Sequence, residues 1–203
     1  KGFSKPKQLA LKCYENNYKA CGIADYKSIS GAVSFYKACI AQNIKPIIGC
    51  TFDNYVLFAK NKDGWFELIQ IVSSIADDGN PDPKVVLDMC KNGNLICIAE
   101  SESVSPIVGD DFYKKTPSFD TRYYTEKEHA QLHRIMLCSS MKTTLSKVNK
   151  AITNGQEVDN QKFFESKDFH LKDKIGATEL VIEGNDLESF SDIYAKCVNY
   201  NIL

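Results

Sequence analysis

Long hydrophobic runs are missing from this sequence of 203 residues. No apolar stretch approaches the roughly 20 residues that a membrane-spanning helix needs, and the first residues carry no signal-peptide pattern. The patterns GxGxxG and GxxxxGKS/T are also missing, so the common dinucleotide and P-loop sites are not indicated. What is present is an ordinary globular composition, with 43% hydrophobic and 25% charged residues. We therefore predict one domain, residues 1–203, with a substantial core and no contact with a membrane.

Cysteine is plentiful, but close cysteine pairs are lacking. No CxxC pair occurs and no cysteine adjoins a histidine among the eight: Cys13, Cys21, Cys39, Cys50, Cys90, Cys97, Cys138 and Cys197. Cysteine-built metal sites need closely spaced ligands, so this spacing argues against zinc. Most of these thiols lie in apolar segments, where cysteine acts as a small hydrophobic residue. We predict buried, reduced thiols and a reducing, cytoplasmic compartment.

Acidic residues are scarce near the N-terminus. Residues 1–60 hold nine lysines and three acidic residues, a balance of +6, whereas the whole chain carries −1. The lysines are scattered, and no arginine or aromatic cluster accompanies them in the sequence. This pattern favours a solvated face, and the alternative is a surface lying near a phosphate backbone.

Short apolar segments alternate with amphipathic ones. Strands are predicted at 20–25, 45–51, 55–59, 95–99, 119–124 and 169–171, and helices at 4–16, 30–43, 65–76, 84–91, 125–138 and from 186 onward. Helix 30–43 is expected to turn Val33, Tyr36 and Ile40 inward, and Thr125 with Glu128 is expected to form a capping box. Such alternation predicts a parallel sheet covered by helices, either as a barrel or as an open doubly wound sheet.

Two blocks of sequence carry a family resemblance. Ala20–Cys39 reads ACGIADYKSISGAVSFYKAC and is followed by NIKPIIGC at 43–50. These blocks resemble the PHP (polymerase and histidinol phosphatase) domain at the front of DNA polymerase III alpha subunits, where TDHG…GAVEFYKACK…GIKPIIGCE is typical. Similar matches recur at 57–69, 93–98, 120–138, 168–172 and 193–199.

The resemblance implies a distorted (β/α)7-type barrel, here lacking or shortening some strands, with a metal cluster at the carboxyl ends of the strands. In the family, the first strand carries a His-x-His pair and precedes the helix that corresponds to residues 4–16, so this chain is expected to start just after that strand. The segment near 100–118 is shorter than in the family. Either part of the barrel has been deleted, or the chain skips a disordered part.

The metal ligands implied by the resemblance are largely replaced. Asp25 and Asp120 keep two ligand positions, whereas Tyr26, Thr51 and Arg122 replace three others. Arginine cannot lose its proton in a protein, so it cannot bind a metal ion. The histidine expected just before the 55–59 strand is also missing. We therefore predict no metal, no other cofactor and no catalytic residue.

The three histidines add little to this expectation. His129 and His133 lie four apart on a predicted helix, a spacing that suits two ligands on one face. No third ligand is evident, so a helix-surface or buried-histidine interpretation is favoured over a metal site. His170 is isolated in a polar segment.

Three functions are compatible with these observations. The favoured one is a degenerate, non-catalytic PHP domain of a bacterial or viral DNA polymerase III alpha-like replication protein, serving as scaffold and docking domain. Its partners would be the polymerase core and the proofreading exonuclease or other replication or viral proteins, with DNA nearby but no specific DNA motif. The second is a free-standing, virus-encoded interaction protein of the same family. The third, an active metal-dependent phosphoesterase or exonuclease, is disfavoured by the replaced ligands.

Overall fold

The computed structural model describes residues 3–77, 79–101, 108–114, 120–121, 123–166, 169, 181–182, 185–186, 193 and 195–203, and only the backbone of 120–121, 181–182 and 185–186. The helices are α1 (Pro6–Glu15), α2 (Ala32–Ala41), α3 (Lys62–Ser73), α4 (Pro83–Cys90), α6 (Ala130–Ser140), α7 (Leu145–Thr153) and α8 (Gln161–Glu165), with 3-10 turns η2 (Gly109–Asp111) and η3 (Lys127–His129). The strands are β1 (Ala20–Tyr26), β2 (Lys45–Thr51), β3 (Tyr55–Ala59), β4 (Leu95–Ala99), β5 (Phe112–Lys114), β6 (Asp120–Thr121), β7 (Val181–Ile182) and β8 (Asn185–Asp186).

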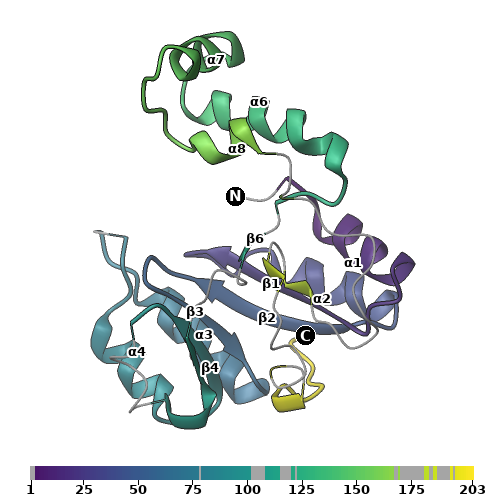
Figure 1. Ribbon diagram of the computed structural model, residues 1–203. Coiled ribbons are helices and arrows are strands. Elements are labelled where there is room, and N and C mark those ends of the chain that lie inside the picture. The colour runs from purple at the N-terminus through teal and green to yellow at the C-terminus, as the bar shows by residue number, and fades with distance from the viewer. Residues whose placement is uncertain are drawn as a thin grey trace.

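These elements form two regions (Figure 1). The sheet body comprises the described residues of the ranges 3–114 and 193–203, together with β6, β7 and β8. The helical unit comprises residues 123–166, with α6, α7 and α8 packed on one another above the sheet. No helix among the described residues is long and apolar enough to cross a membrane.

The strands join in the order β5-β4-β3-β2-β1-β7-β8-β6. β1 and β2 are parallel along their whole length, from Ala20 opposite Lys45 to Tyr26 opposite Thr51. β3 is antiparallel to both β2 and β4, which makes the sheet mixed and corrects the expectation of a parallel one. Only residues 52–54 connect β2 to β3, and such a short connection permits a hairpin but no crossover. The described pairings run as an open series from β5 to β6, and they do not include a pairing that closes a barrel.

The two faces of the sheet bury different partners. Neighbouring residues of a strand point to opposite faces, so Ile48 packs with the four helices α1–α4 while Ile47 packs with Ile193 and Cys197 of the C-terminal segment. At Gly49 an added Cβ would collide with the backbone and ring of β3. Glycine at this position therefore allows β2 and β3 to approach closely.

Helix α2 buries a different stripe from the one expected. Ala32, Phe35 and Cys39 are buried, whereas Val33 is 40% and Ile40 54% exposed. The two stripes have the same helical spacing and are offset by one residue, so periodicity alone cannot choose between them. Of the expected inward stripe, Tyr36 is partly buried against the core, whereas Val33 and Ile40 lie on the surface.

The helical unit has its own small core. Buried Tyr124, Leu137, Val148 and Phe163 belong to one cluster that shares no buried residue with the sheet clusters. Arg134 donates from Nε to the carbonyl of Phe163 (2.8 Å) and from Nη2 to the carbonyl of Ser166 (3.1 Å), which ties α6 to the end of α8.

The junction between the regions runs through the N-terminal segment. The Phe3 N–H donates to the Tyr123 carbonyl (2.6 Å), and Lys12 Nζ pairs with Glu126 Oε1 (2.9 Å). The Thr125 N–H donates to Ser4 Oγ (3.0 Å). The expected capping box of Thr125 and Glu128 is wrong, because η3 begins at Lys127 without a side-chain cap and the α-helix starts only at Ala130.

Several other expectations are confirmed. The strands 45–51, 55–59 and 95–99 match β2, β3 and β4, and all eight cysteines are free and buried. The expected strand 119–124 is represented by β6. The expected strand 169–171 and the helix from 186 lie mostly outside the described residues, as do Arg122, Asp168 and His170.

Candidate functional site

The carboxyl ends of β1 and β2 lie side by side, because the two strands are parallel and in register through Tyr26 and Thr51. A cavity of about 420 Å³ opens beside them, lined by residues 51–56 with Ile98, Glu100 and Ser101 from the end of β4. The family resemblance places a metal cluster at this edge of the sheet. The fold therefore brings Asp25, Tyr26 and Thr51 to the place expected from the sequence.

Asp25 is half-buried near the carboxyl end of β1. A Cβ added at Gly31 would lie 2.7 Å from Asp25 Oδ2, so the start of α2 presses directly on the carboxylate. This close approach explains why glycine occupies position 31. It also restricts access to the Asp25 carboxylate.

Tyr26 and Lys27 both bind the carboxylate of Asp53. The Tyr26 hydroxyl donates to Asp53 Oδ1, and Lys27 Nζ lies 2.8 Å from Asp53 Oδ2. Lys27 Nζ also reaches Asn80 Oδ1 at 3.3 Å. The hydrogen bond from Lys27 lowers the pKa of Asp53, and the same bond raises the pKa of Lys27. Both oxygens of Asp53 are thus engaged by donors of the protein itself.

The backbone at Lys27 is unusual for a lysine. Its φ of +52° lies in the left-handed region, which glycine adopts without steric cost. The family motif TDHG has glycine at this position. A lysine thus stands where the motif has glycine, on a backbone that suits glycine, and its ammonium contacts Asp53.

Thr51 directs its hydroxyl to the backbone. Its Oγ1 donates to the Ala24 carbonyl (2.8 Å), which stabilises the end of the β1–β2 pair. A threonine hydroxyl used in this way offers no carboxylate to a cation. The substitution is consistent with a structural role for position 51.

The described residues at this edge do not fit a dinuclear metal centre. Within the described part of the chain, no three His, Cys, Asp or Glu side chains are grouped so as to hold a metal ion. Lys27 adds a positive charge that would repel a cation, and Asp53 is already bound by Lys27 and Tyr26. Asp120 belongs to β6, where only the backbone is described, and Arg122 is outside the described residues.

Of the two histidines spaced four apart, His133 lies in the core of the helical unit and His129 is half-buried at its edge. His133 is 1% exposed and packs against the rings of Tyr123, Tyr124 and Phe163, with centroids 5.1–5.4 Å apart. His129 packs against Phe3, 5.4 Å away. The buried-histidine interpretation is confirmed for His133.

Lys27 and Asp53 are the residues of this site that the sequence did not reveal. Lys27 could have been noticed, because it stands where the family motif has glycine. Asp53 carried no such signal, since its place beside Tyr26 depends on the tight turn between β2 and β3.

Comparison with known proteins identifies the family. A family model described as PHP domain matches residues 1–186. The DNA polymerase III subunit alpha of Buchnera aphidicola subsp. Schizaphis graminum is 35% identical over 83 residues, which are 36% of this chain and 7% of that protein. The DNA polymerase III subunit alpha of Staphylococcus aureus strain Mu50 is 32% identical over 121 residues, 56% of this chain and 11% of that protein. The matched regions thus span about a tenth of the length of these relatives. The chain belongs to the PHP domain family.

Proposed function

We propose that this chain is a non-catalytic PHP domain that serves as a scaffold and protein-docking domain of a DNA polymerase III alpha-like replication protein. The observation that carries the proposal is the contact of Lys27 and Tyr26 with Asp53 at the carboxyl ends of β1 and β2. The Tyr26 phenol stands at a position that the resemblance assigns to a ligand histidine, and the Lys27 ammonium stands beside it, where the family motif has glycine.

The electrostatics favour this interpretation. Lys27 supplies the positive charge that neutralises Asp53, so a metal ion at the same edge would compete with an ammonium that is permanently attached. The lowered pKa of Asp53 and the raised pKa of Lys27 keep this pair ionised across the neutral range. A dication placed among these groups would gain one carboxylate only by displacing the lysine.

The wider setting follows from the relatives. Both named relatives are DNA polymerase III alpha subunits, and this chain corresponds to a small part of their length. We include in the proposal a cytoplasmic location, contact with a polymerase core and a docking role for other replication proteins. The proposal also includes closure of the sheet into a barrel. It is supported by helices α1–α4, which all pack on one face of the sheet, as helices do around a barrel.

Elemental analysis tests the absence of a metal centre. The chain, purified without chelator and dialysed against manganese or zinc, is expected to retain less than one equivalent of either metal. Two or more equivalents per chain would overturn the proposal. Lys27→Gly serves as the matched variant, because it removes the competing ammonium and restores the glycine suited to the left-handed backbone.

An activity assay separates this proposal from an active phosphoesterase. The parent chain and Tyr26→His are both expected to leave a generic aryl phosphate intact in the presence of manganese. Tyr26→His returns one potential ligand beside Asp25 but leaves Thr51 and Lys27 in place. Metal-dependent turnover by the parent would contradict a non-catalytic role, and turnover by either protein would show that the ligand positions are wrongly assigned.

The scaffold role requires a binding experiment. The chain is mixed with a polymerase III alpha subunit whose own PHP domain has been removed, and the mixture is analysed by size-exclusion chromatography. A stable complex is expected, with that subunit's own PHP domain as the positive control. If only the control binds, the scaffold role fails and the free-standing alternative is favoured.

A further inference from the structure

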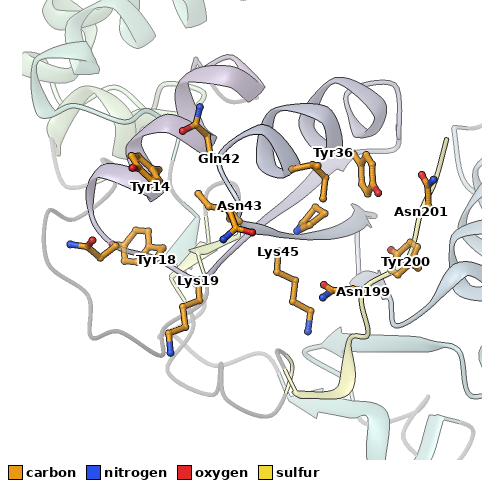
Figure 2. Close-up of a pocket in the computed structure, with 14 residues that line it drawn as sticks. Tyr14, Tyr18, Lys19, Tyr36, Gln42, Asn43, Lys45, Asn199, Tyr200 and Asn201 are labelled. Carbon is orange, nitrogen blue, oxygen red and sulfur yellow. The ribbon is translucent and has the colours of Figure 1, made fainter.

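A second hollow lies at the opposite end of the sheet. This groove has a volume of about 790 Å³ and is bounded by the carboxyl ends of α1 and α2, the amino ends of β1 and β2, and residues 199–201 (Figure 2). β1 extends over seven residues, so the groove is about 20 Å from the edge that holds Tyr26. It is therefore independent of the replaced metal site.

The groove arises because the same turn occurs twice, side by side. Each helix ends in a left-handed asparagine, Asn17 (φ +61°) after α1 and Asn43 (φ +54°) after α2. The next residue bonds back to the helix, Tyr18 N–H to the Cys13 carbonyl (2.9 Å) and Ile44 N–H to the Cys39 carbonyl (2.9 Å). The chain then enters parallel neighbouring strands, which leaves a furrow along the ends of both helices.

Two lysines border this furrow. The Lys45 N–H donates to the Lys19 carbonyl (3.0 Å), so residues 26 positions apart in sequence are neighbours across the sheet. Their side chains extend in the same direction, away from the helices (Figure 2). Burial lowers the pKa of Lys45. None of the fourteen described residues that line the groove is acidic, so the groove complements negative charge.

The helix side of the groove carries rings and amides. Tyr14 is 57% exposed and Tyr36 is half-buried, so part of each side chain is accessible to a ligand. Gln42 and Asn43 stand on the same side of the groove (Figure 2), and Asn17 also lines it. Side-chain amides present a donor and an acceptor together, the pairing that nucleobase edges also present.

These features select one class of ligand. A small anion such as phosphate would occupy a minor part of about 790 Å³ and would leave the rings unused. An acidic peptide would use the lysines but has no particular need for flat rings and clustered amides. Single-stranded nucleic acid uses a basic border, stacking rings and hydrogen-bonding amides at once. We propose that this groove binds single-stranded nucleic acid, with phosphates along Lys19 and Lys45 and bases against Tyr14 and Tyr36.

Fluorescence anisotropy tests the proposal. A labelled oligothymidylate is titrated with the full chain at low salt, and Lys19→Glu and Tyr14→Ala are each expected to weaken binding about tenfold or more. The matched control is Lys147→Glu, the same charge change at an exposed position of α7. It should change the affinity less than about twofold. With two lysines at phosphates, a fourfold rise in salt should weaken binding about sevenfold.

Several outcomes would overturn the proposal. The proposal fails if the parent does not bind the oligonucleotide at low salt. It also fails if Lys19→Glu and Tyr14→Ala both bind with the affinity of the parent. Equal weakening by Lys19→Glu and Lys147→Glu, with Tyr14→Ala unaffected, would reveal only diffuse attraction by charge. Competition by polyglutamate as strong as that by unlabelled oligonucleotide would assign the groove to acidic peptides. Circular dichroism of each variant confirms that a loss of binding is not a loss of fold; the exposed position of Tyr14 makes that variant the safer test.

Discussion

The sheet body and the helical unit are stabilised by different means. The largest fully buried side chains all belong to the sheet body: Phe35, Phe58, Ile47, Ile48, Leu57, Leu68, Ile71, Leu95 and Ile96. The apolar core residues of the helical unit each retain 3–8% exposure, and a histidine lies among them. A continuous sheet buries aliphatic side chains on both faces, whereas three short helices make a thinner core that depends on side-chain bonds to backbone. The difference predicts two levels of stability within one chain.

The largest effect is expected from the core of the sheet body. Phe58→Ala removes a ring with 0% exposure from β3, and the cavity left behind should lower the free energy of unfolding by about 3–5 kcal/mol. Urea unfolding followed by circular dichroism measures this. Phe66→Ala in α3 is the matched control, because Phe66 is 49% exposed. A loss below about 1 kcal/mol for Phe58→Ala would contradict the contrast between the two cores.

A smaller effect confined to the helical unit is expected at Arg134. Arg134→Ala leaves the carbonyls of Phe163 and Ser166 without their charged donor, at a cost of about 2–3 kcal/mol. Hydrogen exchange should accelerate in α6 and α8 and stay unchanged in β1–β4. Arg134→Lys, which can supply one donor but not both, should fall between the parent and the alanine variant. Equal acceleration in the sheet would show that the two regions unfold together.

Cysteine reactivity sharpens the same comparison. Burial raises the pKa of Cys50, Cys97 and Cys197 to about 12, and these thiols lie in the sheet body. Cys138 is the one cysteine at residues 123–166 and is exposed whenever α6 opens. We expect Cys138 to react with a thiol reagent about tenfold faster than the others, a difference of roughly 1.4 kcal/mol in opening free energy. Mass spectrometry of partially labelled chain identifies the site. Two or fewer free thiols in denaturant would indicate disulfides instead.

The smallest effect is expected at the junction. Lys12→Ala breaks the partly exposed ion pair with Glu126, and such pairs contribute about 0–1 kcal/mol. The midpoint of unfolding should change little, with slightly faster exchange at the amide of Thr125. Lys91→Ala, which removes a more exposed pair with Asp88, is the control. A loss much above about 1 kcal/mol would mean that the ion pair, rather than the hydrogen bonds at the Phe3 N–H and the Ser4 hydroxyl, holds the regions together.

Strand positions could be predicted from the sequence, because β2, β3 and β4 are short apolar runs bounded by polar residues. Strand direction at β3 could also have been predicted, since residues 52–54 are too few for a crossover. The buried face of α2 could not. Two stripes of α2 have the same helical periodicity: the buried one, Ala32, Phe35 and Cys39, and the one that lies one residue further along. Only packing against the sheet distinguishes them.

The candidate site shows a similar limit. Alignment to a motif located Asp25, Tyr26 and Thr51, and the parallel register of β1 and β2 places them at one edge. The partners of these residues were not predictable in the same way. The contact of Lys27 with Asp53 depends on two turns that meet only in the folded chain. Lys19 and Lys45 become neighbours only because β1 and β2 pair.

The order of strands in the sheet has a consequence for the folding pathway. β1 to β5 are added in chain order, each beside the one before it, so they close short loops. The other neighbour of β1 is β7, where Cys21 pairs with Val181, 160 positions away. We expect residues up to 114 to fold early and the pairing of β7 to be the slow final step. Pulse-labelled hydrogen exchange should therefore protect β2 and β3 first and Val181 last, so that a nascent chain acquires its core well before the opposite side of β1 is covered.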